Sequence, residues 1–91
     1  MTYEHEVSEL RKEINRINAE IIEKIEERVG VAVEIALIKR RYGKPLVDKQ
    51  RERAVLNQVR LLAAENGVDP DGAERVFIEI IRICVEAEER F

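Results

Sequence analysis

Apolar residues recur at spacings of three and four along residues 7–36, and Glu, Lys and Arg occupy most of the positions between them. This spacing is typical of an amphipathic helix, because it places the apolar side chains on one face. Nothing interrupts the pattern before Gly43 and Pro45, residue types that end helices. The pattern therefore predicts one helix from about Ser8 to Arg41, roughly 50 Å long at 1.5 Å per residue.

Two shorter helices are predicted in the remainder of the chain. Asp48 is a good N-cap for the second, whose apolar stripe continues until Gly67. The third begins at Asp69, with Pro70 at its first helical position. No stretch alternates with the period of two that a strand requires. We therefore expect an all-α fold of three helices, built as one domain over residues 1–91.

The predicted first helix is longer than a domain of this size is wide. A compact chain of this length has a radius of gyration of about 12 Å, and so a diameter near 30 Å. The apolar stripe continues through the part of the helix that overhangs, so another surface must cover it. The commonest solution is a second copy packed about a two-fold axis, and we therefore expect an intertwined homodimer.

Composition narrows the classes of function. With 45% hydrophobic and 38% charged residues, the chain is too apolar for a disordered protein and too polar for a membrane protein. The first six residues lack the regions of a signal peptide, which favours a cytoplasmic location. One cysteine excludes an internal disulfide, and with one histidine it cannot form an ordinary zinc site. The net charge of -3 argues against nucleic acid as a partner, although Lys39–Arg41 is a basic triplet.

A few charged residues fall outside the solvated helix faces. Arg28 lies where the heptad pattern calls for an apolar residue, and Lys39 follows eleven residues later on the same face. Their Cα atoms would be roughly 16 Å apart, a gap over which two long cations could clasp a small dianion. In the alternative interpretation both side chains extend to solvent.

The later helices add further candidates. Asp48, Arg51 and Glu52 share one face of the second helix, where a cap and a surface ion pair would also explain them. Cys84 and Glu88 share a face of the third helix. Taken alone, Cys84 is typical of a small core residue and a terminal glutamate is usually solvated.

The sequence contains no nucleophile paired with a base, no Gly-rich phosphate loop and no metal-ligand cluster. Electrostatic catalysis remains, in which an anion is held in a reactive shape and developing charge is stabilised. The candidate residues for it are Arg11, Arg28, Lys39, Arg51, Glu52 and Glu88.

The chain resembles the all-helical AroQ class of chorismate mutases over essentially its whole length. The matching pieces, in order, are Leu10-Arg11-Lys12-Glu13-Ile14, Glu27-Arg28, Ala36-Leu37-Ile38-Lys39, Gly43-Lys44-Pro45, Asp48, Arg51-Glu52-Arg53 and Val76-Phe77-Ile78-Glu79-Ile80-Ile81. The resemblance implies a homodimer of three-helix protomers with two active sites. It also implies rearrangement of chorismate to prephenate, on the route to phenylalanine and tyrosine, without a cofactor.

By this similarity, Arg11 and Arg28 bind carboxylates, and Lys39 bridges a carboxylate and the ether oxygen of chorismate. Arg11 lies 17 residues before Arg28, roughly 25 Å along one helix, so both cannot contact one small ligand from the same protomer. An antiparallel first helix of the partner can supply Arg11, and the family places this arginine across the dimer interface.

The similarity also assigns roles on the second and third helices. Glu52 accepts a hydrogen bond from the ring hydroxyl with help from the backbone at Asp48, while Arg51 supports the carboxylate site and orders Glu52. Cys84 and Glu88 stand where many members have Ser and Gln, and Cys84 is the poorer donor. Burial and a dianionic substrate should raise the pKa of Glu88, and a protonated Glu88 can donate to the ether oxygen.

Two other functions fit the same pattern. Isochorismate-pyruvate lyase shares the fold, but the set from Arg28 to Glu52 and the Gly-Lys-Pro loop favour the mutase. A non-catalytic helical dimerisation or regulatory module is the other alternative. We expect an independent enzyme because the chain ends with its own helix at Phe91, and a complex with another shikimate-pathway enzyme stays open.

Overall fold

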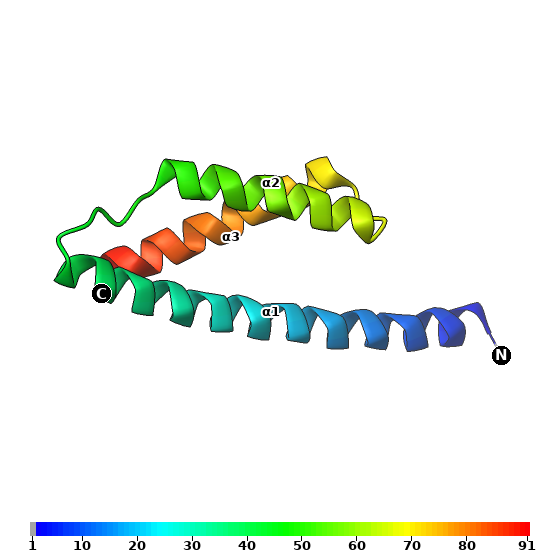
Figure 1. Ribbon diagram of the computed structural model, residues 1–91. Helices are drawn as coiled ribbons and strands as arrows, with labels where there is room; N and C mark the ends of the chain where they lie inside the picture. The colour runs from blue at the N-terminus through cyan, green and yellow to red at the C-terminus, as the bar shows by residue number, and fades with distance from the viewer. Residues whose placement is uncertain (1) are drawn as a thin grey trace.

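The computed structural model describes residues 2–91 as three helices joined by two short connections (Figure 1). These are α1 (Tyr3–Arg41), α2 (Lys49–Glu65) and α3 (Pro70–Arg90). α3 packs against both α1 and α2 and so joins the other two helices. The predicted all-α class and the very long first helix are confirmed. Within residues 2–91, no helix has both the length and the apolar content needed to cross a bilayer.

The start of α1 lies earlier than the apolar pattern predicts. The helix begins at Tyr3, five residues before Ser8. The Thr2 side chain caps it by accepting a hydrogen bond from the backbone N–H of His5 at 3.1 Å, and two glutamates in the first turn favour this end of the helix dipole. The prediction missed this turn because a polar cap, rather than an apolar stripe, defines it.

The ends of α1 and α2 share one turn geometry. Gly43 and Gly67 follow these helices with φ of 66° and 68°, in the left-handed region that glycine adopts without strain. In both turns the next backbone N–H donates to a carbonyl five residues earlier, at 2.8 Å. These bonds satisfy carbonyls that the helix ends leave open, and they reverse the chain direction within a few residues.

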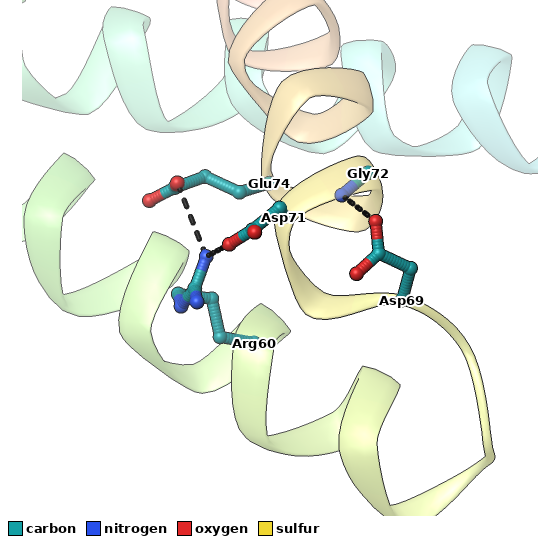
Figure 2. Close-up of polar contacts among 5 residues, drawn as sticks. All are labelled: Arg60, Asp69, Asp71, Gly72 and Glu74. Atoms are coloured by element: carbon teal, nitrogen blue, oxygen red, sulfur yellow. Dashed lines mark hydrogen bonds and ion pairs between the residues drawn. The ribbon is translucent and has the colours of Figure 1, made fainter.

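A polar cluster fixes the corner between α2 and α3 (Figure 2). The Asp69 carboxylate caps α3 by accepting from the backbone N–H of Gly72 at 3.0 Å. Arg60 of α2 reaches Asp71 at 2.8 Å and Glu74 at 3.3 Å, both in the first turns of α3. The hydrogen bond to Asp71 is the largest cause of a raised pKa at Arg60. The Asp69 cap marks the start of α3, and the pairs of Arg60 link this end of α3 to α2.

The single chain buries little apolar surface. The chain extends 62 Å along its longest axis, with a radius of gyration of 17.2 Å against about 12 Å for a compact chain of this length. The N-terminal end of α1 projects beyond α2 and α3 (Figure 1). Its stripe is exposed, from Ile17 at 44% to Leu10 at 60%. The buried apolar residues are Ala36, Val59, Ala63, Ile80, Cys84 and Ala87.

Candidate active site

A cavity of about 370 Å³ lies among the three helices. Its apolar wall includes Ile35 of α1 together with Ile81 and Val85 of α3. Polar side chains from all three helices and from the α1–α2 connection line the rest: Arg28, Lys39, Asp48, Arg51, Glu52, Cys84 and Glu88. Residues from distant parts of the sequence therefore converge on one space whose walls are partly apolar and partly charged.

The two cations of α1 both turn toward this cavity. Arg28 Nη1 donates to Cys84 Sγ at 2.9 Å, and Lys39 Nζ donates to the backbone carbonyl of Leu46 at 2.9 Å. A guanidinium carries five N–H groups and an ammonium carries three, so each cation keeps further donors for a ligand. This arrangement contradicts the alternative in which both side chains extend into solvent.

The first turn of α2 is built around Asp48. Its carboxylate accepts from the backbone N–H of Arg51 at 3.0 Å, and its carbonyl accepts from the N–H of Glu52 at 3.0 Å. The predicted cap is therefore confirmed. Among residues 2–91, Glu52 pairs with Lys49 at 3.6 Å rather than with Arg51. Arg51 and Glu52 both line the cavity, and the ordering of Glu52 by Arg51 stays a prediction.

Glu88 is a buried carboxyl, only 9% exposed, at the end of α3. Its pKa is raised above the ordinary value of 4.5, and burial is the largest cause. Lys39 and Arg28 act in the opposite direction, while Glu52 and Glu89 raise the pKa further. The predicted upward direction is confirmed for the protein without substrate. The interpretation of Glu88 as a solvated terminal glutamate is wrong.

Arg11 is the predicted site residue that does not line the cavity. It lies on the exposed N-terminal part of α1, 17 residues and roughly 25 Å along the helix from Arg28. The separation expected from the sequence is thus present in the structure. The single chain therefore forms the cavity without Arg11.

Two contacts at the cavity were not predicted. The carbonyl of Leu46 holds Lys39, and Arg40 Nη2 donates to the backbone carbonyl of Glu88. Both acceptors are backbone atoms, which carry no side-chain signature in the sequence. One general rule could have pointed to a contact such as that of Arg40, because carbonyls near the end of a helix need hydrogen-bond donors from outside the helix.

Residues 10–89 match the family described as chorismate mutase type II. The chain belongs to this family. It is 35% identical over 80 residues to a chorismate mutase of Methanocaldococcus jannaschii, covering 88% of this chain and 77% of that protein. It is also 36% identical over 88 residues to a bifunctional chorismate mutase/prephenate dehydratase of Aquifex aeolicus, covering 93% of this chain but 24% of that longer protein.

A further relative differs in its described reaction. The chain is 26% identical over 89 residues to a 4-amino-4-deoxychorismate mutase of Streptomyces venezuelae, covering 98% of this chain and 86% of that protein. The family match includes every residue that lines the cavity. The resemblance seen in the sequence is therefore confirmed, and the cavity lies within the matched region.

Proposed function

We propose that this member of the chorismate mutase family converts chorismate to prephenate in the cavity among α1, α2 and α3, as a step of aromatic amino acid biosynthesis. The observation that carries the proposal is the convergence of Arg28, Lys39 and Glu88 on one cavity with an apolar wall. Chorismate carries two carboxylates, which such cations can hold. A cavity of about 370 Å³ lies in the usual range for small-molecule sites.

The reaction is an intramolecular [3,3]-sigmatropic rearrangement. The ether C–O bond between ring and enolpyruvyl arm breaks as a C–C bond forms between the arm and the ring, so substrate and product are isomers. No proton or group is exchanged with the protein. Catalysis then consists of holding the arm over the ring in its pseudo-diaxial form and stabilising negative charge on the ether oxygen.

The two cations of α1 divide these tasks. Arg28 binds a carboxylate through the N–H groups that remain beside its bond to Cys84, which is 2.9 Å long. Lys39, held by Leu46, bridges a carboxylate and the ether oxygen. Because the charge on that oxygen grows only toward the transition state, the Lys39 contact lowers the barrier more than it tightens substrate binding.

The carboxyls act on opposite parts of the substrate. Burial raises the pKa of Glu88, and in its protonated form Glu88 donates to the ether oxygen as the second donor. Glu52 accepts the hydrogen bond of the ring hydroxyl, near the backbone at Asp48. Arg51, which also lines the cavity, supports the carboxylate site.

The complete site requires two chains. Arg11 lies too far along α1 to reach the cavity of its own protomer, so a partner's antiparallel α1 supplies it. An apolar groove of about 580 Å³ between α1 and α3 supports this dimer, since Ile17, Ile21 and Phe77 line it. A second copy covers this groove and the exposed stripe of α1, and makes the homodimer a functional unit with two active sites.

The test is to mix purified protein with chorismate, follow the loss of its ultraviolet absorbance, and identify the product. Prephenate supports the proposal. Pyruvate released when isochorismate is offered instead would indicate the lyase reaction, and chorismate that stays unchanged would refute the proposal. Arg28→Ala should abolish turnover, whereas Arg82→Ala is the matched control, because Arg82 is exposed and pairs with Glu79 at 2.8 Å outside the cavity.

A further inference from the structure

We propose that Arg40 is a positioning residue for Glu88, because it ties the last turn of α3 to α1 and so holds the Glu88 carboxyl inside the cavity. The contact that carries this inference is the hydrogen bond from Arg40 Nη2 to the backbone carbonyl of Glu88, across 48 residues of sequence. The inference rests on the proposed function only where it assigns a catalytic effect to Glu88. The structural part can be measured without substrate.

A hydrogen bond from α1 reaches the last turn that the structure describes in α3. Arg40 Nη2 donates to the backbone carbonyl of Glu88, which lies two residues before the end of the described helix. The donor is a charged guanidinium, and such charge-assisted hydrogen bonds are stronger than those between neutral groups. The contact therefore links α1 to the turn of α3 that carries Glu88.

The helices are close enough here for the contact to control position. Figure 1 shows the C-terminal end of α3 beside the C-terminal part of α1. Ala36, four residues before Arg40 on the same face of α1, is 0% exposed, and Ala87 beside Glu88 is also buried. Lys39 points into the cavity while its neighbour Arg40 reaches the end of α3. One turn of α1 therefore carries both Lys39, a proposed catalytic cation, and Arg40, which holds Glu88 in position.

The direction in which the Glu88 pKa changes when Arg40 is lost distinguishes positioning by Arg40 from a direct effect of the Arg40 charge on the carboxyl. The charged groups that act on the Glu88 pKa are Lys39 and Arg28 of α1, Glu52 of α2 and Glu89 of α3. Asp48, Arg51 and Cys84 line the same cavity. Arg40 bonds to the backbone carbonyl, and the cations that lower the Glu88 pKa are Lys39 and Arg28. Losing Arg40 should loosen the last turn and expose the carboxyl, which lowers its pKa. Losing a cation that acted directly on the carboxyl would raise it.

The experiment compares Arg40→Met with Arg41→Met. Both substitutions remove one positive charge, but Arg41 lies 6.0 Å from the Tyr42 ring instead of bonding to α3. Arg40 is exposed and Met keeps an alkyl stem, so the fold should be retained. Carbon-13 NMR of labelled glutamate carboxyls, with the Glu88 signal assigned by its loss in Glu88→Gln, reports the pKa. The pH profile of kcat reports how the pKa of Glu88 affects turnover.

Arg40→Met should lower the Glu88 pKa and move the alkaline fall of kcat to lower pH. It should also lower kcat about tenfold at neutral pH, as expected for losing a charge-assisted hydrogen bond, with a smaller change in KM. Arg40→Lys should recover part of both effects, because an ammonium also donates. Arg41→Met should resemble the parent protein.

An unchanged or raised Glu88 pKa in Arg40→Met would overturn the inference, as would an equal shift in Arg41→Met. If Arg40→Met does not fold, Arg40→Leu gives the same comparison with another neutral side chain that carries no donor. A parent protein that fails to form prephenate would refute the proposed function alone, because the NMR titration still tests whether Arg40 holds Glu88.

Discussion

In the proposed mechanism, turnover depends on the protonation of Glu88. A protonated carboxyl donates a hydrogen bond to the ether oxygen, whereas an ionised one repels the charge that develops there. Activity should therefore be highest at mildly acidic pH and fall as pH rises through the pKa of Glu88 in the complex. This direction is opposite to that expected of a general base, which must be deprotonated to act.

The surroundings of Glu88 give the direction of its pKa shift, and the hydrogen bond that it donates gives the expected size of the change in kcat. Glu88 is 9% exposed, burial is the largest cause of its raised pKa, and Lys39 and Arg28 only partly offset it. A dianionic substrate beside the carboxyl raises the pKa further. A donor aimed at developing negative charge is worth about 2.7–4 kcal/mol, or roughly 100- to 1000-fold in kcat. That factor is the expected drop between the acidic and the alkaline plateaus.

The assay is kcat across the pH range for the parent protein, Glu88→Gln and Glu89→Gln. A glutamine at residue 88 keeps a donor and removes the titration, so it should hold activity on the alkaline side and flatten the profile. Glu89→Gln is the matched control, because Glu89 is an exposed neighbour and the smallest cause of the raised pKa, so this variant should keep the fall and move it only slightly to lower pH. A flat profile in the parent protein, or a Glu88→Gln variant that is inactive at every pH, would refute the reasoning.

The free energy of unfolding should also depend on the protonation of Glu88. Because the pKa of Glu88 is raised on folding, the folded state favours the protonated form. The resulting stabilisation is complete below the ordinary value of 4.5 and is lost as pH rises through the folded-state pKa. Glu88→Gln removes this dependence, so the difference between its denaturation midpoint and that of the parent protein should change across this window. A pH-independent difference would contradict the raised pKa.

Other substitutions test the remaining parts of the account. Lys39→Ala should lose roughly 3 kcal/mol or more in kcat with a smaller change in KM, and Lys39→Arg should recover little; a raised KM alone would reduce Lys39 to a binding residue. Asp69→Ala should lower the free energy of unfolding by about 1 kcal/mol in denaturant titrations, whereas Asp69→Asn keeps the cap and should lose little. Ile21→Glu, in the apolar groove, should give the mass of one chain in sedimentation, whereas Leu61→Glu, outside the groove, should leave a dimer; a dimeric Ile21→Glu would show that this groove is not the interface.

Local signals explain why most of the fold could be predicted. Asp48 and Asp69 cap α2 and α3, and Gly43 and Gly67 end α1 and α2, as their residue types indicate. Each of these caps and turns involves only three to five neighbouring residues, so a short stretch of sequence contains all of its parts. The start of α1 was missed because the single Thr2 cap precedes the apolar stripe that defined the helix.

The site could be predicted less completely. Helical spacing places Arg28 and Lys39 on one face, and the structure brings both to the cavity. Spacing does not reveal a partner on another helix, so the bond from Arg40 to the carbonyl of Glu88 was not foreseen. The pairing of Glu52 with Lys49 was also not predicted, because several residues of the same turn carry charge and spacing does not show which of them pair. Tertiary packing, which periodicity alone does not encode, decides these contacts.

The most direct test of the shared active site is a subunit-mixing experiment with Arg11→Ala and Arg28→Ala. Each variant alone should be nearly inactive. In a mixed dimer one site carries both lesions and the other carries neither, so random exchange at equal concentrations should restore about a quarter of the parent activity. Native mass spectrometry verifies that mixed dimers form. A mixture that exchanges subunits and stays inactive would contradict the claim that Arg11 of one protomer completes the cavity of its partner.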